Sequence, residues 1–156
     1  MPISLTNSQT RPVRTALLRK AAHRLLREAK LASAQVDILL TDDATMHALN
    51  VQYRGYNKPT DVLSFAQSDS IAGPPPVPVS PDLPVVLGDV VVSVDTAERQ
   101  AQEHGVSLDQ ELALLTVHGI LHLLGYEDET EAGARALHSR ERELLDFTFP
   151  SAALPG

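Results

Sequence analysis

The segment SLDQELALLTVHGILHLLGYED, residues 107–128, predicts the helix around which the chain is built. Ser107 followed three residues later by Gln110 is a capping box, in which two side chains satisfy free amides at a helix start. From Leu112 to Leu124 the helix is apolar almost all round, which is typical of a helix buried on every side. Gly125 then offers the left-handed conformation that ends many helices. We therefore expect a buried core helix that ends just before this glycine.

Apolar periodicity on both sides of this segment predicts further helices and short strands. Helices are expected at residues 12–30, from about 43 to 53, from 95 to about 105, and from 129 or 130 to about 145. Strands are expected at residues 35–40, 61–65 and 85–94, of which the last is nearly all apolar and should be central. Strands and helices mix without strict alternation. The predicted fold class is therefore α+β, with one small mixed β-sheet packed with about five helices.

One long segment between the strands cannot form regular structure. Residues 67–84 hold six of the eleven prolines, and proline is excluded from helix interiors and central strands. We expect a proline-rich loop there and a frayed tail at residues 149–156. No linker or internal repeat divides the sequence, so residues 1–156 are expected to form one domain.

The composition of the 156 residues excludes several classes of protein. Cysteine is absent, which excludes disulfides, thiolate zinc fingers and cysteine nucleophiles and leaves His, Asp and Glu as metal ligands. The net charge of −7 excludes a uniformly basic nucleic-acid-binding domain. The amino terminus lacks the apolar region of a secretory signal, and no apolar stretch is long enough to cross a membrane. We expect a soluble, cytoplasmic protein without a membrane partner.

Charge is divided unevenly along the chain. Residues 1–58 contain nine basic and four acidic residues, a net charge of +5, whereas residues 59–156 carry −12. Five of the basic residues line the polar side of the first predicted helix: Arg19, Lys20, Arg24, Arg27 and Lys30. This basic helix face can contact the phosphates of a nucleic acid or can be an ordinary solvated face, and the sequence leaves both interpretations open.

Two histidines, His118 and His122, lie four residues apart in the apolar core helix, so both rings face the same side about one turn apart. Buried imidazole nitrogens need partners, and one divalent ion would satisfy both rings. A turn after the helix can bring Asp128 to the same point, although Glu127 or Glu129 could replace it. Three such ligands leave an open position, which is typical of catalytic metal sites. The alternative is a histidine pair without a metal.

The same ligand spacing occurs in metzincin proteases, where a glutamate follows the first histidine and acts as the general base. Here that position is Gly119. Without the carboxylate, peptide hydrolysis by the usual route loses its proton acceptor. The chain therefore shares the ligand spacing of these proteases, and its sequence does not support their chemistry.

Three segments resemble the YbeY family of bacterial metal-dependent endoribonucleases. HGILHLLGYED at residues 118–128 is similar to the family signature HGxLHLxGYDH, LNVQYRGYNKPTDVLSF at residues 49–65 to LNxxYRxxxKPTDVLSF, and LGDV at residues 87–90 to LGDI. The resemblance implies an α+β fold, one divalent metal ion, Zn²⁺, and a single-strand endoribonuclease that acts in small-subunit rRNA maturation and ribosome quality control. The implied partners are single-stranded RNA, ribosomal RNA and the small ribosomal subunit.

The chain departs from the family signature at one position, since Asp128 stands where the family has a third histidine. A carboxylate binds zinc well, so the predicted ligand set of His118, His122 and Asp128 is retained. The net charge of the site falls by one, and harder metal ions become competitive. The resemblance also implies that Arg54 and Lys58 lie near the metal, where they would neutralise a phosphodiester. Ordinary exposed loop charges are the alternative for this pair.

Other polar residues have less specific surroundings in the sequence. Asp89 lies in the apolar strand at 85–94, where we expect it to be buried and to orient a backbone group or a metal-ligating histidine. Tyr126 could stack a base or cap the core helix. The remaining histidines are expected at the surface: His23, His47, His104 and His138.

Three functions are compatible with these features. The first is a metallo-endoribonuclease acting on single-stranded RNA, which the resemblance favours. The second is a zincin-like metalloprotease, and the third is a non-enzymatic, ribosome-associated RNA-binding module with a structural metal. Metal removal separates an enzyme, which keeps its fold, from a module whose fold depends on the metal.

Overall fold

The core helix begins and ends as its sequence predicts. In the computed structural model, which describes residues 3–67 and 85–149, α4 spans Leu108–Leu123 and begins with the complete capping box of Ser107 and Gln110. Ten of the residues of α4 are buried. Gly125 follows in the left-handed region with a φ of 100°. The helix is thus the centre of the core, in contact with α1, α3, α5 and two strands.

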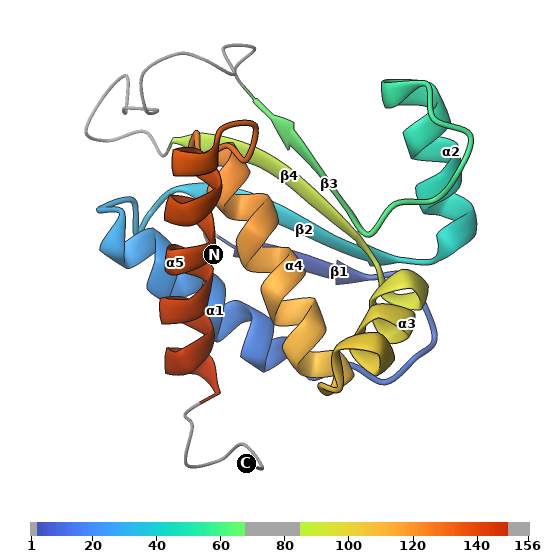
Figure 1. Ribbon diagram of the computed structural model, residues 1–156, viewed down its shortest axis with the longest axis horizontal. Coiled ribbons are helices and arrows are strands. Elements are labelled where there is room, and N and C mark those ends of the chain that lie inside the picture. The colour runs from blue at the N-terminus through green and yellow to red at the C-terminus, as the bar shows by residue number, and fades with distance from the viewer. Residues whose placement is uncertain (1–2, 68–84, 150–156) are drawn as a thin grey trace.

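Four strands form one mixed sheet in the order β1-β2-β4-β3 (Figure 1). They are β1 (Ile3–Asn7), β2 (Gln35–Thr41), β3 (Val62–Ala66) and β4 (Val86–Ser93). β1, β2 and β4 are parallel, and β3 pairs antiparallel with β4 at one edge of the sheet. β4 is therefore central, as its apolar sequence predicts. β1, at the other edge, is not among the predicted strands.

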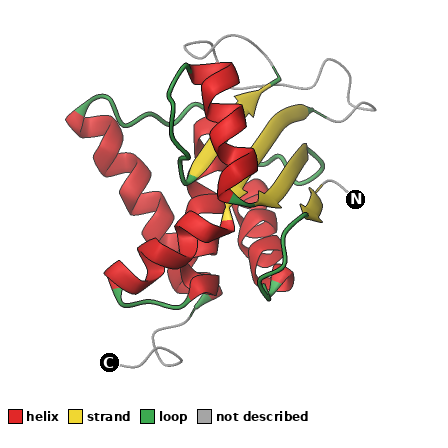
Figure 2. Ribbon diagram, turned by 90° about the vertical axis from the view of Figure 1, so that its right-hand side faces the viewer, coloured by secondary structure: helices red, strands yellow, loops and turns green. Residues whose placement is uncertain are grey.

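Helices cover both faces of the sheet (Figures 1 and 2). Besides α4, the helices of the described residues are α1 (Thr15–Glu28), α2 (Asp43–Arg54), α3 (Val94–His104) and α5 (Glu131–Thr148). α1 and α4 pack over one face, on residues such as Val36 and Val90, and α5 packs on both helices. Alternate strand residues point to the other face, where Met46 of α2 packs on Leu63 and Val91 in a second, smaller cluster.

The mixed sheet and the five helices of the described residues confirm the predicted α+β fold class. The largest deviation at a helix start is that of α1, which begins at Thr15 rather than at Pro12. The amide of Arg14 donates a 3.1 Å hydrogen bond to the carboxylate of Asp109, at the start of α4. A contact with another helix thus fixes this boundary, and the local sequence does not mark it.

Part of the sequence lies outside the described residues. The predicted proline-rich loop falls there apart from Gln67, and so does the predicted tail apart from Phe149. The amide of Phe149 donates to the carbonyl of Leu145 and closes α5. Across 3–67 and 85–149, no helix combines the length and the apolar character that a membrane crossing requires.

Candidate metal centre

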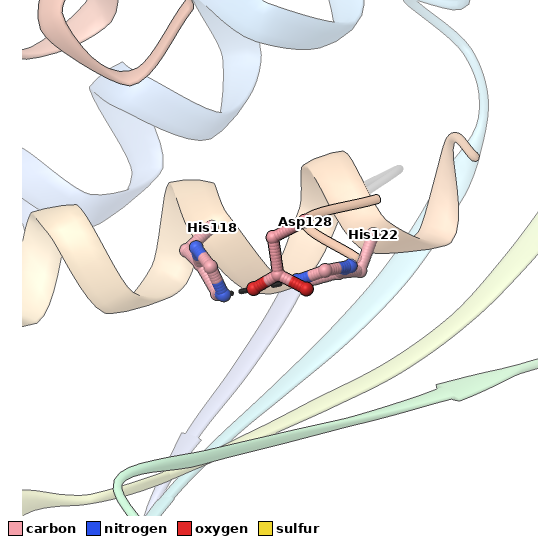
Figure 3. A group of neighbouring side chains, drawn as sticks. All are labelled: His118, His122 and Asp128. Carbon is pink, nitrogen blue, oxygen red and sulfur yellow. Dashed lines mark hydrogen bonds between the residues drawn. The ribbon is translucent and has the colours of Figure 1, made fainter. Parts of the chain in front are cut away.

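His118 and His122 face the same side of α4, as their spacing predicts (Figure 3). Their ring centroids are 4.4 Å apart with the ring planes at 77°, and the two Nε2 atoms lie 2.9 Å from each other. Both rings are partly buried, and the side chain of His118 is 24% exposed. The pair therefore remains in contact with solvent, so an ion and a substrate can reach it.

Hydrogen bonds at the opposite ring nitrogens orient both imidazoles. Nδ1 of His118 donates to Oε1 of Glu141 at 2.6 Å, and Nδ1 of His122 donates to the carbonyl oxygen of Tyr126 at 3.0 Å. Because a neutral imidazole carries one N–H, a proton at Nδ1 leaves a lone pair at Nε2 of each ring. Two lone pairs 2.9 Å apart repel each other unless a proton or a cation lies between them. The donor set therefore fits a metal ion.

The turn after α4 carries the third donor. The amides of Gly125 and Tyr126 donate to the carbonyls of His122 and Leu121, which closes α4 with a Schellman motif. Beyond this turn, a carboxylate oxygen of Asp128 and one nitrogen of each histidine lie within 4.8 Å of one another, and Figure 3 shows the three side chains converging. The amide of Tyr126 thus takes part in capping α4, one of the two expected roles of this residue, and its side chain packs against the core.

Glu127, the neighbour of Asp128, has other partners. Oε2 of Glu127 accepts hydrogen bonds from the amides of Glu129 and Thr130, and Oε1 accepts one from the Thr130 hydroxyl at 2.7 Å. The Thr130 hydroxyl also caps the start of α5 by accepting from the amide of Gly133 at 3.0 Å. This network fixes the turn that carries Asp128 and keeps Glu127 outside the group of possible ligands.

Gly119 follows His118 where α4 packs tightly against the sheet. A Cβ atom at this position would lie 2.5 Å from Cγ1 of Val90 and 3.1 Å from Oγ of Ser64. The hydroxyl of Ser64 also donates to the carbonyl of Gly119 at 2.9 Å. A glutamate here, as in the metzincin proteases, would push α4 away from β3 and β4. The packing therefore adds a steric argument against protease chemistry to the chemical one.

The surroundings of the two histidines shift their pKa values in opposite directions. The hydrogen bond to Glu141 raises the pKa of His118 above its ordinary value, although burial opposes this shift. Burial lowers the pKa of His122, and the neighbouring His118 lowers it further. In the metal-free protein a proton therefore occupies His118 first, and its Nε2–H can donate to Nε2 of His122.

Glu141 is the residue of this centre that the sequence analysis missed. It lies on α5 and is only 5% exposed, on a helix face shared with the buried Leu137 and Leu144. Its second carboxylate oxygen lies 3.4 Å from Nδ1 of His138. The sequence does carry a signal for Glu141, because this charged residue stands at a position where the helical periodicity of α5 calls for an apolar one. A carboxylate buried on that face needs a partner.

The four histidines expected at the surface have different surroundings. The side chains of His104 and His138 are 54% and 64% exposed, yet each pairs with a buried glutamate, which was not foreseen. Nδ1 of His104 lies 2.8 Å from Oε1 of Glu111. His23 and His47 are half-buried. None of the four belongs to the group of possible metal ligands that the described residues contain.

The prediction that Asp89 is buried and orients a metal-ligating histidine is wrong. Successive strand residues point to opposite faces of a sheet, and because Val90 packs against α4, Asp89 points away from it. Asp89 is exposed and lies opposite Asp37 of β2. Desolvation and the Asp37 carboxylate raise the pKa of Asp89. The carboxylate that orients a histidine of the centre is that of Glu141.

Arg54 and Lys58 are exposed at and beyond the end of α2. The guanidinium of Arg54 lies over the ring of Tyr56, 5.3 Å from its centroid, and the backbone carbonyl of Lys58 accepts a hydrogen bond from Asn50. No hydrogen bond or ion pair within residues 3–67 and 85–149 joins either cation to the three possible ligands. Their role beside a metal therefore stays a prediction.

The basic face of α1 is partly neutralised by its surroundings. Arg24 pairs with Glu28 at 2.6 Å, and the charged groups of Lys20 and Arg24 lie over the ring of Phe147. Arg19 donates to the carbonyl of Ile3. Three cations in α1 or just beyond its end are exposed, namely Lys20, Arg27 and Lys30. Of these three, Arg27 and Lys30 have no aromatic neighbour within the described residues, whereas Lys20 is exposed beside Phe147.

Comparison with known proteins finds the same family over most of the chain. The family model for Endoribonuclease YbeY matches residues 4–148. A protein of that name from Pelotomaculum thermopropionicum is 43% identical over 150 residues, which cover 93% of this chain and 95% of the relative. The relative from Moorella thermoacetica is 45% identical over 152 residues, with 93% and 96% covered. Both carry the name Endoribonuclease YbeY.

A solved structure supports the fold independently. The solution structure of a Thermotoga maritima protein is similar to this chain with a TM-score of 0.62, and it is 22% identical. The similarity covers 94% of this chain and 89% of the other protein. The family match confirms the resemblance seen in the sequence, and the structural match confirms the fold class.

Proposed function

The chain belongs to the YbeY family of endoribonucleases, and from this premise we propose that it is a metal-dependent endoribonuclease that cleaves single-stranded RNA. The proposed substrate is ribosomal RNA, in the maturation of the small ribosomal subunit and in ribosome quality control, and the proposed compartment is the cytoplasm. One observation carries the proposal, namely two Nε2 atoms 2.9 Å apart beside a carboxylate on the turn after α4.

The proposed ion is Zn²⁺, held by His118, His122 and Asp128. Two imidazoles and one carboxylate with a further position open are typical ligands of catalytic zinc. A carboxylate in place of a third imidazole makes Mn²⁺ and other harder ions more competitive. When bound, the ion would supply a Lewis acid that polarises a phosphodiester oxygen.

The residues of the chain prepare the site for this chemistry. Glu141 and the carbonyl of Tyr126 hold the Nδ1 protons of the two histidines, which keeps both Nε2 lone pairs available. Asp128 adds one negative charge to the ligand set. Arg54 and Lys58 are proposed to neutralise phosphates of the bound RNA, because a cation beside a phosphodiester stabilises charge that develops during cleavage.

Two alternatives are less compatible with the geometry. The protease would need a carboxylate where Gly119 packs against Val90. A structural metal would need a closed set of ligands, whereas His118 and His122 are partly exposed and Asp128 is exposed.

The proposal is tested with the full chain on three substrates: a single-stranded RNA fragment, the same sequence as a duplex, and casein. We expect the zinc-loaded protein to cleave only the single strand. Chelation should abolish cleavage while circular dichroism stays unchanged, because the core around α4 forms without the metal. Loss of the fold on chelation would identify a structural metal, and hydrolysis of casein would identify a protease.

Two histidine variants connect this activity to the centre. His122→Ala should lose both bound zinc and RNA cleavage. His23→Ala is the matched control, since His23 is also a half-buried histidine on a helix and lies outside the ligand group. It should keep both. Undiminished cleavage in His122→Ala would contradict the proposal.

A further inference from the structure

An exposed run of residues joins the end of α2 to the turn that follows it. All eight residues from Val51 to Lys58 are exposed. Val51, Tyr53 and Tyr56 are 46%, 58% and 52% exposed, and they are three of the six large hydrophobic side chains found exposed in the described residues. Exposed aromatic side chains that lie close together mark binding sites, and Tyr53 and Tyr56 stand three positions apart at the end of α2.

The two tyrosine rings are held in place by aromatic and cationic neighbours. The ring of Tyr53 meets that of Phe65 edge to face, with centroids 5.1 Å apart and planes at 68°. Phe65 itself packs on the second core cluster. The guanidinium of Arg54 lies over the ring of Tyr56. We call Tyr53, Arg54, Tyr56 and Lys58 the aromatic patch.

Hydrogen bonds also fix the backbone that carries the aromatic patch. Gly55 ends α2 in the left-handed conformation with a φ of 73° and turns the chain toward Tyr56. The side-chain amide of the buried Asn50 donates to the carbonyl of Lys58 at 2.8 Å. The rings are thus exposed on a backbone that is tied to α2, which limits the entropy lost when a ligand stacks on them.

The charge of this surface differs from that of the whole chain. Residues 44–60 contain the cations Arg54 and Lys58 and no Asp or Glu, whereas the chain carries a net charge of −7. Exposed aromatic rings beside cations are the combination that binds single-stranded nucleic acid, in which bases stack and phosphates meet positive charge. An acidic peptide would meet the cations but would leave the ring faces unused.

Strand β3 connects the aromatic patch to the candidate metal centre. Phe65, which supports Tyr53, follows Ser64, whose hydroxyl donates to the carbonyl of Gly119 beside His118. β3 is an edge strand, and Figure 1 shows it running between α4 and α2. Because Ser64 and Phe65 point to opposite faces of the sheet, a strand of RNA would pass from the centre to the aromatic patch around the edge that β3 forms.

We propose that Tyr53 and Tyr56 stack bases of the single-stranded RNA, with Arg54 and Lys58 beside its phosphates. The inference rests on the proposed function for the identity of the ligand. It assigns the aromatic patch as the surface that selects unpaired over paired RNA, because the bases of a duplex are already stacked on one another and cannot lie on the rings.

The test uses a 2′-O-methyl oligonucleotide that carries the fluorescent base 2-aminopurine, with binding followed by fluorescence anisotropy. We expect the wild-type protein to quench 2-aminopurine on binding. Tyr56→Ala and Tyr53→Ala should each reduce the quenching and weaken binding by roughly 5-fold to 150-fold, the range of base–aromatic stacking. Tyr56→Phe and Tyr53→Phe, which keep the ring, should bind as the wild type does.

Two further variants test whether binding depends on an aromatic ring and on its place in the aromatic patch. Tyr56→Leu keeps an apolar side chain without a ring and should weaken binding as Tyr56→Ala does. Phe147→Ala removes the exposed aromatic ring of α5, which also lies beside two cations, and should leave the quenching unchanged. Wild-type affinity and quenching in both tyrosine-to-alanine variants would overturn the proposal, as would a loss confined to Phe147→Ala.

Failure of this inference is distinct from failure of the proposed function. If the tyrosine variants lose stacking while the zinc-loaded protein leaves RNA intact, the aromatic patch binds RNA and the nuclease proposal is wrong. If RNA is cleaved while the tyrosine variants bind the oligonucleotide normally, the nuclease proposal stands and the aromatic patch has no role in stacking.

Discussion

Glu141 accepts a 2.6 Å hydrogen bond from Nδ1 of His118, a residue 23 positions earlier on a different helix. The contact ties α5 to α4 at the point where the candidate metal centre lies. A carboxylate that accepts from the distal nitrogen of a metal-ligating histidine fixes its tautomer and makes it a better ligand. Glu141 is thus a positioning residue, and the centre extends beyond the three side chains that face the ion.

Glu141→Gln should weaken zinc binding by about 10-fold to 100-fold, because a neutral amide does not hold the Nδ1 proton of His118 as a carboxylate does. Affinity would be measured by competition with a chromophoric chelator. Glu111→Gln is the matched control, since Glu111 is also a buried glutamate paired with a histidine but lies at the other end of α4. The control should cost stability and leave zinc affinity unchanged. Equal affinities for all three proteins would show that the contact with His118 is only structural.

Gly119→Ala should destabilise the fold by about 1–3 kcal/mol, because the new methyl group overpacks the interface between α4 and the sheet. Its Cβ would lie 2.5 Å from Cγ1 of Val90. The free energy of unfolding in urea provides the measurement. In a Val90→Ala background the cost of the same substitution should shrink, since the clashing atom is gone. Equal costs in both backgrounds would count against this packing account.

His104 should make stability depend on pH. The hydrogen bond to Glu111 raises the pKa of His104, and Glu103 adds to the shift, so the folded state binds the proton more tightly than the unfolded state. The resulting stabilisation is complete below the ordinary histidine pKa of about 6.5 and is lost as the pH rises through the raised native pKa. The difference in free energy of unfolding between wild type and His104→Gln should therefore be larger at about pH 6 than at about pH 9. Urea titrations at both pH values that give the same difference would refute this pKa argument.

The basic face of α1 should determine how strongly RNA affinity depends on salt concentration. If Lys20, Arg27 and Lys30 contact RNA phosphates, their replacement by Gln should flatten the slope of log affinity against log salt by about 2. The same charge change at Arg99, Arg135 and Arg142, outside α1, is the control and should alter the slope less. Identical slopes for the α1 variant and the wild type would assign this face to ordinary solvation.

The sequence predicts those features whose causes are local. The capping box of Ser107 and the apolar run of α4 act within one helix, and the spacing of His118 and His122 needs only helical geometry. The family signature adds Asp128, whose convergence with the histidines depends on the turn at Gly125. All these features lie in one continuous segment of about twenty residues, so pattern and geometry suffice for them.

Features that depend on residues far apart in the sequence were not predicted or were predicted wrongly. β1 is a five-residue edge strand with Ile3 as its buried residue, and its partner β2 lies beyond α1. The role of Glu141 requires knowing that α5 packs on α4. Asp89 was misassigned because an apolar strand sequence does not show which of its two faces a polar residue points to, and here that face carries Asp37.

RNA cleavage should require an ion held by His118, His122 and Asp128. The most direct measurement is a zinc titration of the metal-free protein, with bound zinc per chain and the rate of single-stranded RNA cleavage recorded on the same samples. The rate should rise in proportion to occupancy and reach its maximum at one zinc per chain, and His118→Ala should neither bind zinc nor cleave. Full cleavage before zinc is added, or cleavage by His118→Ala at the wild-type rate, would contradict the requirement for this ion.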